Sequence, residues 1–137
     1  MHAFRLDPRL EGDTLPVAIM GLCELRLMDD SRWPWLILVP RRDGIAEFHD
    51  LTPLDQTMLT FEASLVSKAL KQLMRADKIN TAMIGNVVAM LHLHVVARFT
   101  GDHNWPKPVW GLDGRIPYDD EAGENLARAL REAILVA

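Results

Sequence analysis

The chain has 137 residues, of which 49% are hydrophobic and 25% charged, and its formal net charge is -4. These values are typical of a globular protein with a core of its own, and we predict one domain over residues 1–137. The negative charge argues against broad nucleic-acid binding, which needs a basic surface.

The single cysteine, Cys23, excludes a disulfide framework within the chain and a zinc site built from cysteines. The N-terminal sequence lacks the apolar stretch of a signal peptide, and no uninterrupted apolar run approaches the roughly 18 residues of a membrane-spanning helix. We therefore expect a cytoplasmic protein that does not bind membranes.

The first predicted elements form an antiparallel hairpin. The sequence CELRLM, residues 23–28, partly alternates between apolar and polar residues and predicts a strand. The segment SRWPW then turns, and the β-rich run WLILVP stops at Pro40.

Residues 50–78 give the strongest helix signal in the chain. Thr52 has the side chain of an N-cap, Pro53 suits the first helical turn, and Asp55 favours the positive N-terminal end. Apolar residues at helical spacing predict a stripe that packs against a sheet. The stripe comprises Leu54, Met58, Leu65, Leu70 and Leu73, with their neighbours Phe61, Val66 and Ala69.

The second half of the chain predicts two more strands, a loop and a helix. KINTAMIGNVV, residues 78–88, indicates a strand and then a turn near Gly85 and Asn86, and MLHLHVVARF indicates the next strand. Residues 101–120 are rich in Pro, Gly and Trp, as loops are, and residues 121–137 form an amphipathic helix. This order of elements predicts an α+β fold with a mainly antiparallel sheet.

His92 and His94 are one residue apart within the apolar sequence VVAMLHLHVVAR. Because side chains alternate along a strand, both rings face the same way. The pair fits two core histidines, each of which then needs a hydrogen-bond partner. It also fits a metal site completed by Asp102 or His103. A third interpretation is chemistry at phosphorus.

In this third interpretation one neutral imidazole attacks phosphorus and forms a labile phosphoramidate, which water hydrolyses in a second step. The other imidazole contacts a phosphate oxygen or transfers a proton near neutral pH. The phosphate needs hydrogen-bond donors around it, and backbone N–H groups at the turn near Gly85 and Asn86 are suited to that role.

The sequences GNVVAMLHLHVVARF and WPKPVWG closely resemble the histidine triad (HIT) family of nucleotide hydrolases and transferases. More narrowly, they resemble its bacterial branch of diadenosine tetraphosphate hydrolase-like proteins, as do RWPWLILVPRR, DKINTAMIGNVV and the opening FRLDPRL. The resemblance covers nearly the whole chain. It implies a HIT-like fold with an antiparallel sheet of about five strands, one long central helix and a C-terminal helix. It also implies a homodimer in which two sheets join into one.

The family motif, H-φ-H-φ-H-φ-φ with φ apolar, reads here as MLHLHVV, residues 90–96. By this resemblance His92 is the nucleophile that takes the nucleotidyl group, and His94 contacts the phosphate. Met90 replaces the first histidine, which in the family helps to orient the ring of the nucleophile. A methionine neither donates nor accepts hydrogen bonds well.

The resemblance also assigns the remaining site residues. Asn86 assists His92 and His94 in catalysis on the leaving-group side of the phosphate. The expected substrate-binding residues are Asn80, Gly85, Asp29 or Asp30 at the ribose, Met90, and Trp105 near the leaving group. We expect Trp35 to pack in the core and assign no role to Trp110.

We therefore expect a hydrolase or nucleotidyl transferase that acts on nucleoside phosphoramidates or dinucleoside polyphosphates through a covalent nucleotidyl-histidine. The substrate is expected to be a purine nucleotide, with no obligatory cofactor and no metal. Two alternatives stay open. One is a nucleotide-binding sensor or partner-binding module with little or no turnover, because of Met90. The other is a zinc-dependent enzyme using His92, His94 and Asp102.

Overall fold

The computed structural model describes residues 3–135. One five-stranded antiparallel sheet has the strand order β1-β2-β3-β5-β4. The strands are β1 (Thr14–Ile19), β2 (Cys23–Met28), β3 (Trp35–Pro40), β4 (Lys78–Ala82) and β5 (Leu93–Arg98). The helices are α1 (Pro8–Asp13), the short 3-10 helix η1 (Phe48–Asp50), α2 (Pro53–Met74) and α3 (Ala122–Leu135). The predicted α+β fold is confirmed.

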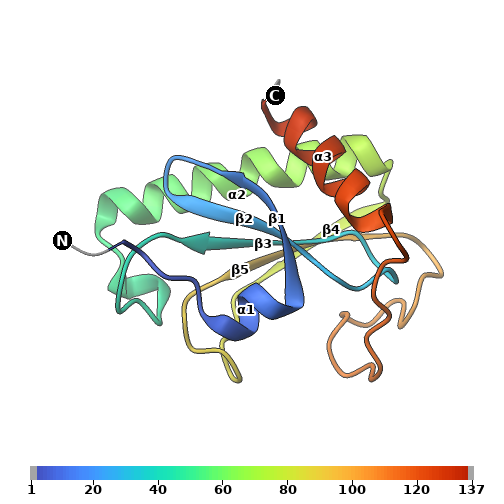
Figure 1. Cartoon of the computed structure of the whole chain (residues 1–137), viewed down its shortest axis with the longest axis horizontal. Helices are drawn as coiled ribbons and strands as arrows, with labels where there is room; N and C mark the ends of the chain where they lie inside the picture. The colour runs from blue at the N-terminus through green and yellow to red at the C-terminus, as the bar shows by residue number, and fades with distance from the viewer. Residues whose placement is uncertain (1–2, 136–137) are drawn as a thin grey trace.

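The sheet separates two layers, as Figure 1 shows: α2 and α3 lie on one face, and α1 lies on the other with the loop after β4 and much of the loop after β5. Side chains of β3 alternate between these layers. Leu36 and Leu38 pack in the cluster that includes α2, whereas Trp35 and Ile37 pack with Leu10 of α1. Because both layers cover them, β3 and β5 are buried along their whole length.

The start of α2 agrees with the sequence prediction. Thr52 is the N-cap, and its hydroxyl oxygen accepts a hydrogen bond of 3.2 Å from the backbone N–H of Asp55. Pro53 occupies the first turn. The carboxylate of Asp55 also pairs with Arg42, with Nε and Oδ2 2.8 Å apart.

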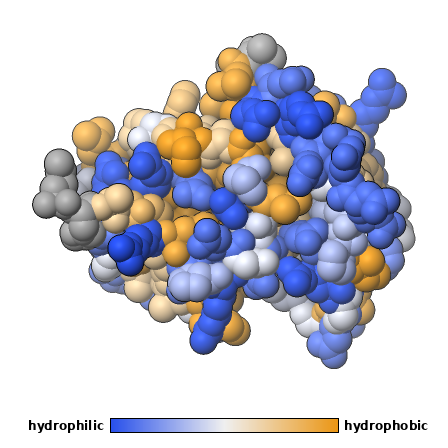
Figure 2. Space-filling model, in the orientation of Figure 1, coloured by the Kyte–Doolittle hydropathy of each residue, from blue (hydrophilic) through white to orange (hydrophobic). Residues whose placement is uncertain are grey.

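The predicted apolar stripe of α2 is wrong at three positions, because Leu54, Phe61 and Leu73 are 73%, 62% and 41% exposed. Figure 2 shows hydrophobic residues spaced along the upper edge of the molecule, over α2. The face turned toward the sheet instead carries Asp55, Leu59, Glu62, Val66, Ala69 and Leu70.

The buried face of α2 is therefore rotated about the helix axis relative to the predicted stripe, and Glu62 lies on this buried face. Its carboxylate accepts hydrogen bonds from the backbone N–H groups of Leu22 and Cys23, at 2.7 and 3.0 Å, in the turn between β1 and β2. A buried carboxylate is tolerated when its oxygens are paired in this way. A prediction that rests on apolar residues alone places such a side chain in solvent.

The elements α1 and β1 were not predicted from the sequence. Both are six residues long, and both are interrupted by residues that weaken a periodic pattern. In α1, Pro8 follows the capping residue Asp7, whose carboxylate accepts from Arg9 N. In β1, Pro16 is tolerated because the strand lies at the sheet edge, and the pairing with β2 shifts just after it.

Candidate active site

A cavity of about 300 Å³ opens beside His92 and His94 on the α1 side of the sheet. Its walls come from α1, β2, β3, the loop after β4 and the loop after β5. The lining residues are Leu10, Asp13, Met28, Trp35, Ile37, Ile84, Gly85, Asn86, Val87, Val88, His92, His94 and Trp110. The walls are largely apolar, and the two imidazole rings stand among them.

His92 immediately precedes β5, which begins at Leu93. The ring is fixed by its own chain, because Nδ1 lies 2.7 Å from the carbonyl oxygen of Met90. A carbonyl only accepts hydrogen bonds, so Nδ1 carries the hydrogen. The neutral ring therefore has its lone pair on Nε2.

His94 has the opposite arrangement. It pairs with Ile37 of β3 and Ala82 of β4, and its Nδ1 accepts a hydrogen bond of 3.0 Å from the indole Nε1 of Trp35. An indole N–H only donates, so Nδ1 of His94 holds the lone pair and the ring hydrogen is on Nε2. The rings of His92 and His94 lie 4.8 Å apart between centroids.

Neither Nε2 atom is closed off from solvent. In residues 3–135, every side-chain nitrogen or oxygen that is closed off from solvent has a hydrogen-bond partner. The protein hydrogen bond described for each ring uses Nδ1. The site thus presents one imidazole lone pair, on His92, next to one imidazole N–H, on His94.

The pKa of His94 is lowered to about 3, mainly by burial and in addition by the nearby His92. Burial disfavours the charged ring because a cation loses its hydration, and two imidazolium ions this close repel each other. His94 is therefore neutral at pH 7 and acts as a fixed hydrogen-bond donor.

The loop between β4 and β5 forms one wall of the cavity. Gly85 has a φ of 70°, in the left-handed region that favours glycine, and a Cβ there would lie 3.5 Å from the carbonyl oxygen of Val88. Asn86 follows on the exposed side. Arg9 of α1 donates from Nη1 to the carbonyl oxygen of Val87, at 3.0 Å, and so connects this loop to the opposite wall. Gly85 and Asn86, both predicted site residues, are thus brought to the histidines.

Asn80 and Trp105 lie elsewhere, around the fully buried guanidinium of Arg98. Asn80 Oδ1 accepts from Arg98 Nη1 at 3.0 Å, and the ring of Trp105 lies 5.4 Å from Arg98 Cζ. Asp102 binds the same guanidinium through both oxygens, at 2.7 and 2.9 Å. None of these three residues lines the cavity.

The two acids expected at the ribose are engaged in the protein. Asp29 Oδ1 accepts from Tyr118 N at 2.9 Å, and both oxygens of Asp30 bind Arg32. Burial works against ionisation of Asp30, but the hydrogen bonds and charge of Arg32 outweigh it and lower the pKa of this carboxyl. The acid that lines the cavity is Asp13.

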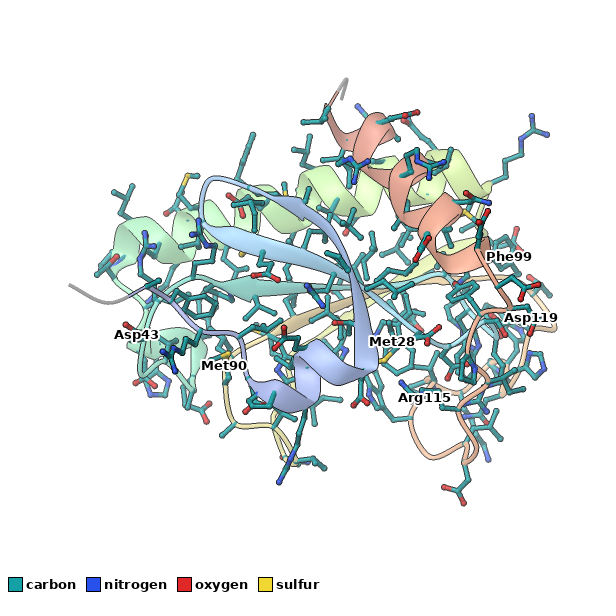
Figure 3. The ribbon with its side chains drawn as sticks, in the orientation of Figure 1. Met28, Asp43, Met90, Phe99, Arg115 and Asp119 are labelled. Carbon is teal, nitrogen blue, oxygen red and sulfur yellow. The ribbon has the colours of Figure 1, made fainter. Side chains whose placement is uncertain are left out.

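Met90 does not reach the cavity. Its side chain is half-buried and packs against the cluster of Trp33, Trp35 and Val96, and it lines a separate hollow with Gly44 and Ala89. In Figure 3, Met90 and Met28 stand on opposite sides of α1, with Met28 on the side of Arg115. Met90 therefore contributes its carbonyl to the site rather than its side chain.

The zinc alternative lacks its third ligand. Within the described part of the chain, no three His, Cys, Asp or Glu side chains gather as a metal ion requires. Asp102, which that alternative uses, has both oxygens bound to Arg98.

No helix among residues 3–135 is both long and apolar enough to span a bilayer.

Sequence reasoning missed several walls of the cavity. Leu10 and Asp13 belong to the helix that was not predicted, and Met28 and Ile37 read only as strand residues. Trp35 is buried as expected, but it also lines the cavity and binds His94. Trp110 packs edge-on against His94, with centroids 4.9 Å apart. The proline-rich sequence around Trp110 predicted a loop but did not indicate that this loop packs against His94.

Comparisons with known proteins agree with this fold. The model of the HIT domain family matches residues 10–101. A histidine triad protein of Sinorhizobium meliloti is 52% identical, with 95% of this chain and 96% of that one covered and a TM-score of 0.92. Histidine triad proteins of Bradyrhizobium japonicum (41% identity, 97% and 99% covered, TM-score 0.93) and Marinobacter aquaeolei (40%, 98% and 98%, 0.94) are also similar. None of the curated proteins compared with the chain matches it.

Proposed function

Because the chain belongs to the HIT domain family, we propose that it cleaves the α-phosphate linkage of a nucleotide through a covalent nucleotidyl-histidine at His92. One observation carries this proposal: His92 offers a lone pair at Nε2 beside the Nε2–H of His94, in a cavity with apolar walls. Nucleophilic catalysis at phosphorus needs this combination of an unprotonated nucleophile and a neighbouring donor.

In the first step, the lone pair of His92 Nε2 forms a bond to the α-phosphorus. The bond from phosphorus to the leaving group breaks, and its electron pair leaves with an amine or a phosphate, which takes up a proton. In the second step, a water oxygen attacks the same phosphorus and the P–N bond breaks. The nucleoside monophosphate is released, the water's proton is lost, and His92 returns to its neutral form.

Three features of the cavity suit a nucleotide. Leu10, Ile37 and Trp110 give apolar and aromatic surface for a purine base. The loop at Gly85 and Asn86 lies next to the histidines, where the phosphate is held in this proposal. For the ribose hydroxyls we assign Asp13, since it is the acid among the lining residues.

The substrates to be tested are adenosine 5'-phosphoramidate and diadenosine tetraphosphate, incubated with the wild type and with His92→Ala. We expect AMP release by the wild type, its loss in the variant, and an AMP adduct on His92 by mass spectrometry after rapid quenching in alkaline denaturant, because a phosphorus–nitrogen bond to histidine is hydrolysed in acid. Equal turnover by the two proteins contradicts the nucleophile assignment. Nucleotide binding without turnover in the wild type supports instead the role of a sensor.

We also propose a cytoplasmic homodimer. This proposal is supported by the exposed apolar residues Leu54 and Phe61 on α2, and by the position of β4 at the sheet edge, followed by half-exposed Met83 and Ile84. Sedimentation velocity measures the assembly directly. The wild type is expected to sediment as a dimer and Phe61→Glu as a monomer, whereas a monomeric wild type contradicts the proposal.

A further inference from the structure

Trp35 and His94 are neighbours on adjacent strands, both deeply buried. Trp35 opens β3 and is 7% exposed, and His94 on β5 is 5% exposed. Their ring centroids lie 5.7 Å apart, and the indole Nε1 is 3.0 Å from His94 Nδ1. This is a normal hydrogen-bond distance.

The indole limits His94 to one of its two neutral forms. A neutral imidazole carries one hydrogen, on Nδ1 or on Nε2, and the form is set by what its nitrogens meet. A hydrogen on Nδ1 of His94 would point at the hydrogen of the Trp35 indole. The two N–H groups would repel each other, and both would lose their hydrogen bond in a buried place.

The form of His94 matters for a phosphate at the neighbouring His92. With its hydrogen on Nε2, His94 donates to a phosphate oxygen as charge develops on it. With its hydrogen on Nδ1, the ring turns a lone pair toward the same oxygen and repels it. Protonation of both nitrogens, which would give a donor on each side, does not occur at pH 7, because burial keeps His94 neutral.

We propose that Trp35 is a positioning residue that holds His94 as an Nε2–H donor toward the transferred phosphate. This inference rests on the function proposed above. Trp35 also lines the cavity, but its indole N–H acts on the transferred phosphate only through His94. Its ring also makes edge-to-face contacts with the rings of Trp33 and Trp110, whose centroids lie 6.1 and 5.8 Å away, and a phenylalanine at position 33 keeps an aromatic ring there.

The test compares Trp35→Phe with the matched control Trp33→Phe. Both substitutions remove the N–H of a buried indole, but that of Trp33 donates to the carbonyl oxygen of His103 and has no contact with His94. Two-bond ¹H–¹⁵N correlation spectra of histidine-labelled protein distinguish the two neutral forms. The His94 signals are assigned by their loss in His94→Gln.

We expect the Nε2–H form of His94 in the wild type and in Trp33→Phe, and a mixture of forms in Trp35→Phe. The kcat of Trp35→Phe should fall roughly 10- to 100-fold, as for other lost partners of a functional histidine. Its KM should change much less, because the donor acts mainly on the developing charge. Thermal unfolding of both variants shows whether either fails to fold.

Two results overturn the proposal: an Nδ1–H form of His94 in the wild type, or an unchanged form and kcat in folded Trp35→Phe. The wild-type spectrum decides even when Trp35→Phe does not fold. The spectra need no substrate, so they are independent of turnover. A wild type with the expected His94 form and no turnover of any nucleotide contradicts the proposed function and leaves the Trp35–His94 assignment standing.

Discussion

Nδ1 of His92 lies 2.7 Å from the carbonyl oxygen of Met90, so the ring of the proposed nucleophile is oriented by the backbone at the position where the HIT motif has its first histidine. Met90 replaces the first histidine of the motif, and a methionine side chain cannot orient a ring by hydrogen bonding. The carbonyl oxygen at this position is present whatever the side chain, and Met90 points its own side chain away from the cavity.

Replacing Met90 should therefore change catalysis little. We expect Met90→Ala and Met90→His to keep kcat within roughly threefold of the wild type, since both retain the carbonyl oxygen. Met90→Ala should lower the free energy of unfolding by about 1 kcal/mol, through lost packing of a half-buried side chain. Steady-state kinetics and urea unfolding measure the two effects. A large gain in kcat for Met90→His contradicts orientation by the backbone alone.

Acid should destabilise the fold through His94. The pKa of this ring is about 3 in the folded protein, against 6.5 for the ordinary group, because of burial and the nearby His92. The unfolded chain therefore takes up the proton first. The stability that depends on a neutral His94 is complete above about pH 6.5 and is lost as the pH falls toward 3, at most at about 1.4 kcal/mol per pH unit.

The comparison for this prediction is His94→Gln, whose free energy of unfolding should fall less steeply with acid over the same range. The control is His49→Gln, because the side chain of His49 is 81% exposed. That variant should keep the slope of the wild type. Parallel curves for wild type and His94→Gln contradict the lowered pKa of His94.

Asp13→Asn should weaken nucleotide binding with little effect on the chemical step. Asp13 lines the cavity from α1, whereas His92 and His94 line it from the start of β5 and the residue just before it. If it binds the ribose hydroxyls, the variant should raise KM roughly tenfold with kcat nearly unchanged. Steady-state kinetics on a ribose and a 2'-deoxyribose substrate provide the check. A variant that discriminates between the two sugars as the wild type does argues against this contact.

Asp102→Asn should destabilise the fold strongly. Arg98 and Asp102 have side chains only 1% and 8% exposed, and removing the carboxylate leaves the guanidinium buried without its charged partner. We expect a loss of about 3 to 5 kcal/mol in the free energy of unfolding. Asp55→Asn is the control: its partner Arg42 is 46% exposed and can turn to water, so a smaller loss is expected. Chemical denaturation of both variants ranks them.

The parts of the fold that the sequence predicted are those with a clear periodic or capping signal. The strand at residues 23–28 and the Thr52 cap of α2 were predicted at the residues where they lie. The element α1 has the capping pair Asp7 and Pro8 but is only six residues long, too short for a periodic pattern, and β1 is interrupted by Pro16. Which face of α2 is buried depends in part on the hydrogen bonds that Glu62 accepts from the backbone of Leu22 and Cys23. These residues are about 40 positions away in the sequence, so no local pattern contains that information.

The residues of the candidate site also fall into those that a local sequence pattern placed correctly and those that it did not. The spacing of His92 and His94 placed both rings on one face, and the turn at Gly85 and Asn86 placed the loop beside them. Asn80 and Trp105, assigned by resemblance, gather at Arg98 instead. Which nitrogen of each histidine carries hydrogen depends on contacts with Trp35 and with the backbone, and these exist only in the folded chain.

The hydrogen bond from Arg9 to the carbonyl oxygen of Val87 joins positions 78 residues apart in the sequence. The two walls of the cavity that it joins are therefore brought together by tertiary structure and not by proximity in the sequence. A fragment that starts beyond α1 contains every histidine of the motif and still has one side of its binding site open to water. Enclosure of the cavity is therefore a property of the whole fold and not of the histidine segment alone.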